Sequence, residues 1–231
     1  MESLSHAQHK GMWSGKLRDL REITHQIQLH PDAQPVYSAT YRDEPHRRQE
    51  IENQVRTMLD LGVIKPLDFE CSVPVVVLPK PSRHFRYFGD YHRLMERTVK
   101  DVYLIPRMED FLDSLGDATM FSTLDCTSGY WKITMATEDR DETTFMSPKG
   151  LFRFLRHRFG LVNAPASFQR SPDILFSGLR WKTILVYLKD LIVSSLMVED
   201  HIWHRQDVLL LLEKAGVSLI LSKCSLFQKN A

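Results

Sequence analysis

The chain contains 231 residues, of which 43% are hydrophobic and 26% are charged. Such a composition is typical of a globular protein that can bury a sizeable core, in one large domain or two small ones. Because 30 Lys and Arg residues balance 29 Asp and Glu residues, the formal net charge is only +1. Bulk charge therefore does not indicate a polyanion-binding protein, and any nucleic-acid site must arise from local clusters of basic residues.

The cysteines and the apolar runs bear on the cellular compartment of the protein. Cys71, Cys126 and Cys224 are odd in number, widely spaced and without a C-x-x-C pattern, so neither a disulfide framework nor a structural zinc site is indicated. The N-terminus has no apolar segment typical of a signal peptide, and the longest apolar runs are too short to span a bilayer. We expect an intracellular protein, either cytoplasmic or nuclear.

The first elements in chain order are an arm and a helix. Residues 1–45 are polar and punctuated by prolines, which predicts an extended N-terminal arm. A helix is predicted from Pro45 to Leu61, since Pro45 suits its first position and Gly62 suits its end. The apolar residues of this segment repeat at helical spacing: Ile51, Val55, Met58 and Leu59.

Short runs of apolar and β-branched residues predict strands and hairpins. In chain order these are residues 73–79 with 85–89, 119–124, 143–146 with 151–155, 184–195 and 217–221. The hairpin at 184–195 carries Lys189 and Asp190 at its tip. Helices are predicted at 107–115, 164–176 and 199–214, the second of which Pro172 should kink or shorten. The irregular alternation of helices with hairpins indicates an α+β fold with a mainly antiparallel sheet covered by helices on one face.

Two aspartates at the ends of predicted strands are candidates for chemistry. The phosphate-loop, dinucleotide-binding, nucleophile-elbow and zinc-protease motifs are all missing from the sequence. Asp125 ends a strand that looks buried, and Asp190 lies at the hairpin tip. A carboxylate in such a place is costly unless it faces a cleft or binds a cation, so the pair suggests a shared metal site. The alternative is that each aspartate only caps a turn.

Several longer segments resemble, in the same order and spacing, the reverse transcriptase of Ty3/gypsy-type LTR retrotransposons. They are LPKPSRHFRYFGDYHRL, KDVYLIPRMEDFLDSLG, FSTLDCTSGYWKI, RFGLVNAPASFQ and LVYLKD. The resemblance covers roughly residues 22 to 229 and implies the fingers and palm of a Pol polyprotein, with the thumb absent. It places a fingers/palm domain at 46–231, with the fingers at about 46–118 and 140–160 and the palm at about 119–139 and 161–231.

The resemblance implies a role for the two aspartates. Nucleotidyl transfer of this kind uses two divalent ions held by converging carboxylates, so Asp125 and Asp190 would be catalytic and bind Mg²⁺ or Mn²⁺. The family's Y-x-D-D hairpin reads Tyr187-Leu188-Lys189-Asp190 here, with Lys189 in place of the first aspartate. An ammonium about 4 Å from a divalent ion repels it by at most about 8 kcal/mol at an effective dielectric constant near 20. Alternatively, Lys189 pairs with both carboxylates and replaces the metal.

Other positions match the family's nucleotide and nucleic-acid sites. Tyr130 matches the aromatic gate that favours deoxynucleotides, although a core tyrosine would explain it as well. Lys80 and Arg86 match residues that hold the incoming triphosphate, and Phe159 with Gly160 begins the segment that backs the templating pair. Tyr187 and a group of basic residues match the nucleic-acid cleft, where interleaved aromatic residues could stack on bases or lie in the core. The basic residues are Arg83, Arg86, Arg93, Arg97, Lys100, Arg153, Arg156, Arg158 and Arg170, and the aromatic ones are Phe85, Tyr87, Phe88 and Tyr91.

Further residues depart from the family pattern and suggest relaxed constraint. Met95 stands in place of asparagine, Arg158 stands in place of proline, and Pro172 interrupts a predicted helix. His201 and His204 lie three residues apart on a predicted helix and could nominally bind a metal. Because no third ligand is near them in the sequence, we predict that both lie on the surface.

Three functional interpretations follow from the sequence. The first is an RNA-directed DNA polymerase, a nucleotidyltransferase that uses Mg²⁺, dNTPs and an RNA or DNA template-primer, with catalysis impaired or absent because of Lys189. The second is a non-catalytic module that binds template-primer with a steep salt dependence and no need for Mg²⁺. The third is a decayed retroelement fragment without activity. Other segments of a Pol polyprotein are further expected partners.

Overall fold

The computed structural model describes most of the chain, which divides into two compact units. The described residues are 24–34, 44–67, 72–79, 85–104, 107–126, 129–179, 182–188 and 190–229. The first unit contains residues 102–132 and 165 onward, and the second contains residues 24–101 and 133–164. The limits of arm, fingers and palm that the sequence predicts stay a prediction. Among the described residues, no helix has the length and apolar character needed to cross a membrane.

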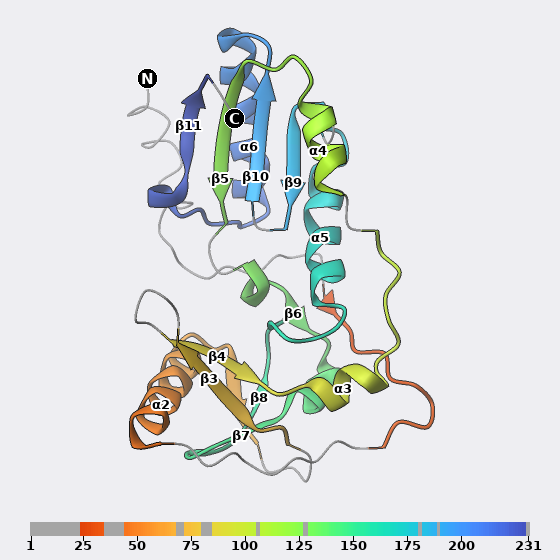
Figure 1. Ribbon diagram of the computed structural model, residues 1–231, viewed down its shortest axis with the longest axis vertical. Coiled ribbons are helices and arrows are strands. Elements are labelled where there is room, and N and C mark those ends of the chain that lie inside the picture. Colours follow the sequence, from red (N-terminus) through yellow and green to blue (C-terminus); the bar gives the residue numbers. More distant parts are fainter. Residues whose placement is uncertain are drawn as a thin grey trace. The chain divides into compact units, whose positions relative to one another are not determined.

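The first unit is built on a four-stranded antiparallel sheet (Figure 1). Its strands lie in the order β11-β5-β10-β9 and span Ser225–Gln228, Met120–Asp125, Asp190–Ser195 and Ile184–Tyr187, respectively. β10 pairs with β5 along its whole length, from Asp190 opposite Asp125 to Ser195 opposite Met120. This sheet confirms the predicted α+β fold with mainly antiparallel strands and the predicted hairpin at 184–195.

The longer helices of the first unit are α4 (Met108–Leu115), α5 (Ala164–Leu175) and α6 (Val198–Lys214). Because side chains alternate along a strand, one face of the sheet is apolar and packs with α6 into a core. This core includes Leu124, Ile184, Val186, Leu191, Val193, Val208, Leu209 and Leu212. The same alternation places Asp125 and Asp190 on the opposite face of the sheet.

One detail of the first unit differs from the sequence-based expectations. The helix α5 contains Pro172 and ends at Leu175, one residue before its predicted end. The strand predicted at 217–221 is wrong, because in this stretch Leu219 forms an isolated bridge to Cys126 and the 3₁₀ helix η5 (Leu221–Lys223) follows. Residues 217–219 are buried, so their apolar character reflects packing into the core rather than a ladder of strand hydrogen bonds. The last strand, β11, begins at Ser225 instead.

The second unit contains a three-stranded antiparallel sheet, a hairpin and a short parallel pair of strands. The three-stranded sheet has the order β2 (Ile64–Pro66), β8 (Gly150–Phe154) and β7 (Phe145–Ser147). The hairpin joins β3 (Val75–Pro79) to β4 (Phe85–Gly89), and β1 (Thr24–His25) pairs with β6 (Thr134–Met135). The predicted pairings of 73–79 with 85–89 and of 143–146 with 151–155 are confirmed, with small shifts of the strand ends.

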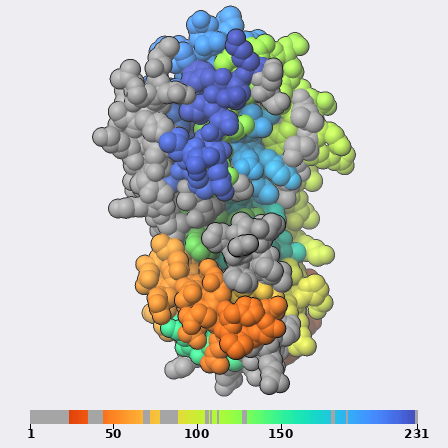
Figure 2. Space-filling model, turned by 60° about the vertical axis from the view of Figure 1, so that its left-hand side comes forward, coloured from red at the N-terminus to blue at the C-terminus, as the bar shows by residue number. Residues whose placement is uncertain are grey.

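Helices α2 (Pro45–Asp60) and α3 (His92–Arg97) complete the second unit, with the 3₁₀ helices η3 (Thr137–Asp139) and η4 (Asp141–Thr143). The predicted amphipathic helix is confirmed in α2, whose polar side chains are mostly exposed. The helix lies at the surface of the second unit (orange in Figure 2). Three of its four predicted apolar contacts are buried, namely Ile51, Val55 and Met58. Leu59 is 36% exposed, so the apolar stripe of α2 is narrower than the sequence predicts.

Candidate active site

Asp125 and Asp190 come together at one end of the sheet in the first unit. They lie directly opposite each other on β5 and β10, so their side chains leave the same face with Cβ atoms about 5 Å apart. Asp125 is buried at 8% exposure, whereas Asp190 is exposed. Like charges placed opposite each other on neighbouring strands destabilise a sheet, and a bound cation offsets that repulsion. The structure thus unites the two carboxylates that the sequence linked.

β9 ends at Tyr187 and β10 begins at Asp190, and these two residues pair with each other. The prediction that Asp190 lies at the tip is therefore corrected, since Asp190 is the first residue of β10. Leu188 has a φ of 52°, in the left-handed region that two-residue hairpin loops require and that bulky residues rarely adopt. Lys189 lies outside the described residues.

Gln169 of α5 anchors this loop from inside the first unit. Its side chain is fully buried, and its Oε1 accepts a hydrogen bond of 2.8 Å from the Leu188 N–H. Its Nε2 donates to the Val186 carbonyl at 2.9 Å and to Asp173 Oδ1 at 3.1 Å. Sequence reasoning missed this role, although Gln169 closes the segment RFGLVNAPASFQ that carries the family resemblance.

Two tyrosines that the sequence singled out have aromatic neighbours in the first unit. Tyr130, in the 3₁₀ helix η2 (Gly129–Lys132), stacks on Phe168 of α5 with ring centroids 4.9 Å apart and planes inclined by 26°. Burial raises the pKa of Tyr130 above its usual value. Tyr187 packs edge-on against Phe111 of α4 at 5.7 Å. Both rings are therefore held by aromatic contacts within the first unit.

Lys132 is a buried cation that sequence reasoning missed. It is 1% exposed, its Nζ donates to the Ser218 carbonyl at 3.0 Å, and burial lowers its pKa to about 8, partly opposed by Cys126. Burial raises the pKa of the Cys126 thiol to about 12, so this thiol is not a nucleophile at neutral pH. Both residues line a small apolar pocket of about 30 Å³. Other residues that line it are Phe168, Pro172, Val186, Leu188 and Leu191.

Asp125 and Asp190 are the described residues best placed to hold a metal ion. In the described part of the chain, no group of three or more His, Cys, Asp or Glu side chains is arranged to bind one. Two carboxylates fit a divalent ion such as Mg²⁺ only as part of its shell of about six oxygen ligands, the rest being water or substrate oxygens. The donor set therefore fits a weakly held ion, and the sequence adds the positive charge of Lys189 next to Asp190.

Apart from Tyr130, which lies in the first unit, the predicted nucleotide-binding residues belong to the second unit and are only partly described. Lys80 lies outside the described residues, and Arg86 is described only as part of the backbone of β4. The Phe159 side chain is 58% exposed. Gly160 has a φ of 92°, a conformation that favours glycine, so the chain reverses directly after Phe159.

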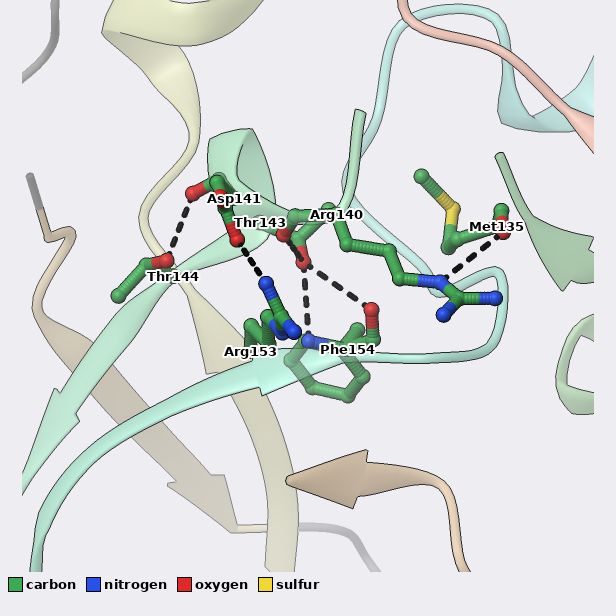
Figure 3. A network of polar contacts seen from close by, with 7 residues as sticks. All are labelled: Met135, Arg140, Asp141, Thr143, Thr144, Arg153 and Phe154. Atoms are coloured by element: carbon green, nitrogen blue, oxygen red, sulfur yellow. Dashed lines mark hydrogen bonds and ion pairs between the residues drawn. The ribbon is translucent and has the colours of Figure 1, made fainter. Parts of the chain in front are cut away.

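Several of the predicted nucleic-acid-binding arginines make contacts within the second unit. Arg153 forms an ion pair with Asp141, and Figure 3 shows this pair beside the hydrogen bonds between Thr143 and Phe154. Arg97 donates to the Gln34 carbonyl and Arg156 donates to Thr134 Oγ1. Arg93 and Lys100 of this group are exposed, and Arg83 lies outside the described residues.

Arg158 corrects the expectation that every basic residue of this group faces nucleic acid. It is 3% exposed, and its guanidinium lies between the rings of Tyr91 and Phe154. Tyr91 is buried as well, so it offers no face for a base. Arg170, in the first unit, lies over the Tyr103 ring at 4.7 Å.

The prediction that His201 and His204 lie on the surface is wrong for His201, which is fully buried. Its Nε2 is 2.7 Å from Ser122 Oγ, its Nδ1 is 3.0 Å from Ser195 Oγ, and His204 Nδ1 is 2.8 Å from the same hydroxyl. Burial lowers the pKa of His201 to about 4, and Arg205 and His204 add to that effect. These contacts form a structural hydrogen-bond cluster rather than a metal site.

Comparison with known proteins places these features in context. Residues 78–231 match the family described as reverse transcriptase (RNA-dependent DNA polymerase). The Pol polyprotein of transposon 297 from Drosophila melanogaster is 36% identical over 202 residues, covering 85% of this chain and 19% of that polyprotein. The gypsy Pol polyprotein from the same organism is 33% identical over 205 residues, covering 86% of this chain and 20% of the polyprotein. The chain thus spans about a fifth of the length of these curated relatives.

Solved structures show the same fold. The protease-reverse transcriptase of prototype foamy virus superposes with a TM-score of 0.88 at 21% identity, covering 99% of this chain and 31% of the viral one. A foamy viral protease-reverse transcriptase in complex with an RNA/DNA hybrid gives a TM-score of 0.89 at 20% identity, covering 98% and 31% of the two chains. At these identities the likeness establishes the fold, which is that of fingers and palm.

Proposed function

Because this chain belongs to the reverse transcriptase family, we propose that its first unit carries a nucleotidyl-transfer site built on Asp125 and Asp190. The observation that supports this proposal is the register of β5 and β10, which sets the two carboxylates opposite each other at the end of one sheet face. The relatives are Pol polyproteins, so template-primer and dNTPs are the proposed substrates. A divalent ion bound there would stabilise negative charge on the transferred phosphate.

Lys189 sets the expected level of activity. The first aspartate of the family's Y-x-D-D hairpin is missing here, and the ammonium of Lys189 stands in its place. This exchange removes one ligand and adds a charge that repels a divalent ion, so the metal affinity of the site falls. We therefore propose that templated DNA synthesis by this chain is weak or absent, although Asp125 and Asp190 lie opposite each other on β5 and β10.

The remaining site residues are assigned by the resemblance. Tyr130, held against Phe168, would discriminate against a ribose 2′-hydroxyl. Lys80 and Arg86 would bind the triphosphate. Phe159 and Gly160 would contact the nascent base pair, with Gly160 providing the left-handed backbone that lets the chain turn there.

Primer extension on an RNA template, with Mg²⁺ or Mn²⁺, tests the proposal directly. The native chain is compared with Lys189→Asp, and the matched control is Lys182→Asp, which makes the same charge change at an exposed lysine in the same unit. We expect Lys189→Asp alone to gain activity, because it restores the missing carboxylate. Adding Asp125→Asn to Lys189→Asp should abolish the gain.

Each outcome bears on a different part of the proposal. Extension by the native chain at the level of Lys189→Asp would show that two aspartates suffice and that Lys189 does not impair catalysis. Equal gains from both lysine variants would assign the effect to bulk charge rather than to the metal site. No extension by any variant would contradict the proposal of a latent nucleotidyl-transfer site.

Nucleic-acid binding without catalysis is the second candidate, favoured by Lys189 and by exposed basic residues such as Arg93 and Lys100. Binding of a labelled template-primer by the native chain in EDTA, measured by fluorescence anisotropy, tests it. The affinity should fall steeply between low and moderate salt, since each phosphate contact releases counterions. An affinity that depends on Mg²⁺, or that ignores salt, would exclude this candidate.

A further inference from the structure

Arg158 occupies a buried position directly before the Phe159–Gly160 segment in the second unit. Its guanidinium carbon lies 4.5 Å from the centroid of the Tyr91 ring and 4.6 Å from that of the Phe154 ring. Two aromatic faces thus stabilise a positive charge that is almost removed from solvent. A surface arginine that serves only as a phosphate contact would not be enclosed in this way.

Hydrogen bonds give the enclosed guanidinium a defined task. Its Nε donates to the Phe159 carbonyl at 2.7 Å, and its Nη1 donates to Tyr91 Oη at 3.2 Å. Tyr91 Oη in turn donates to the Thr143 carbonyl at 2.6 Å, and Thr143 Oγ1 accepts from the Phe154 N–H at 2.9 Å, the contact drawn in Figure 3. Arg158 therefore links the Phe159 backbone to η4 and β8.

The neighbouring backbone is shaped around this contact. A Cβ at Gly89 would lie 2.5 Å from Tyr91 Cε2 and 2.8 Å from Arg158 Nη1, so any other residue would displace the pair. Gly160 takes its left-handed φ immediately after the carbonyl that Arg158 holds. The exposed Phe159 side chain thus extends from a backbone that is fixed on both sides.

We propose that Arg158 is a positioning residue, which holds Phe159 and Gly160 in place for an incoming nucleotide. This inference rests on the proposed function, since the resemblance is what assigns a nucleotide to this segment. Where the family usually has proline, a ring restricts the backbone directly. In this chain the guanidinium fork restricts it through the Phe159 carbonyl, which a point charge such as lysine does not reproduce.

The first test measures how firmly Arg158 holds the Phe159–Gly160 backbone, and it does not depend on enzymatic activity. Amide hydrogen exchange is followed by mass spectrometry in the native chain, in Arg158→Met and in the control Arg156→Met, which removes a guanidinium that donates to Thr134 instead. Exchange in residues 159–161 should accelerate about tenfold or more in Arg158→Met, the factor that loss of one hydrogen bond to a charged group corresponds to. Gly89→Ala should do the same with the arginine present. Equal exchange in Arg158→Met and Arg156→Met would overturn the proposal.

The second test separates positioning from general stability. In the Lys189→Asp background, Arg158→Met should raise the KM for dNTP about tenfold and leave kcat nearly unchanged, because ground-state placement of the nucleotide is lost. Arg158→Lys should behave like Arg158→Met. A proportional loss of kcat without a change in KM, or full rescue by lysine, would overturn the positioning role. If the Lys189→Asp chain shows no primer extension, the result counts against the proposed function. Hydrogen exchange alone would then decide whether Arg158 holds the Phe159–Gly160 backbone.

Discussion

His201 belongs to a hydrogen-bond chain whose direction follows from its two ends. The Phe227 N–H donates to Ser122 Oγ at 3.2 Å, and we predict that the Ser122 hydroxyl in turn donates to His201 Nε2, 2.7 Å away. In that arrangement His201 carries its proton on Nδ1 and donates to Ser195 Oγ, which donates to His204 Nδ1. The opposite tautomer would leave the Ser122 hydrogen buried without an acceptor, at a cost of about 1–3 kcal/mol.

The tautomer of His201 is therefore a prediction that spectroscopy can check. In ¹⁵N-labelled protein at neutral pH, the His201 nitrogen shifts should report a protonated Nδ1 and an unprotonated Nε2. Ser122→Ala removes the donor to Nε2, and the tautomer preference should weaken or reverse. A native spectrum with protonated Nε2 would show that the chain runs in the other direction.

Some positions in the fold could be predicted from the sequence, and others could not. Asp125 and Asp190 could be predicted as partners because strand ends and a motif point to them. The burial of His201 and Arg158 could not, since the spacing of a histidine along a helix is the same on either face and an arginine in a loop carries no sign of the rings around it. Packing between elements distant in sequence decides such positions.

At the scale of elements, Gln169 joins α5 to the β9–β10 hairpin. Gln169→Leu leaves the Leu188 N–H and the Val186 carbonyl without their partner. We expect the free energy of unfolding to fall by about 2–4 kcal/mol, because two backbone groups lose hydrogen bonds in a buried place. Urea denaturation measures the change.

Two further variants sharpen this test. Gln206→Leu, at an exposed position on α6, should change the unfolding free energy by less than about 0.5 kcal/mol. Gln169→Glu keeps an acceptor for Leu188 but loses the donors to Val186 and Asp173 and buries a carboxylate beside Asp173, so its stability should fall at least as far as that of Gln169→Leu. Equal unfolding midpoints for Gln169→Leu and Gln206→Leu would show that α5 does not support the hairpin through this side chain.

Elements with a clear period could be predicted from the sequence, and ambiguous ones could not. α2 and α6 follow 3.6-residue patterns with matching end signals, and their predicted limits agree closely with the structure. The stretch 217–221 has the composition of a strand, yet it is a buried connection, because an apolar run has the same pattern in either setting. Whether such a run becomes a strand or a buried connection depends on which backbone groups lie beside it. The sequence of the segment itself does not contain that information.

At the scale of the whole molecule, both units contain buried histidines that resist protonation. In the second unit, His25 and His157 are buried with ring centroids 4.2 Å apart, and their planes are almost perpendicular. Burial lowers the pKa of His25 to about 4, partly opposed by Asp101, and burial together with His25 and Arg158 lowers the pKa of His157 well below its usual value. His201 has the same property in the first unit.

Acid should therefore destabilise both units. In the unfolded chain the imidazole pKa returns to about 6.5. Below that pH, His25 and His201 therefore bind protons in the unfolded chain but stay neutral in the folded one until the pH approaches 4. This contribution to stability is fully present above pH 6.5 and falls as the pH drops toward about 4, by up to about 3 kcal/mol for each of His25 and His201.

Urea unfolding at pH 7, 6, 5 and 4.5 measures the slope of unfolding free energy against pH. His25→Gln and His201→Gln should each flatten it, whereas His46→Gln, at an exposed position, should leave it unchanged. An unchanged slope in both buried variants would assign the acid sensitivity to other groups.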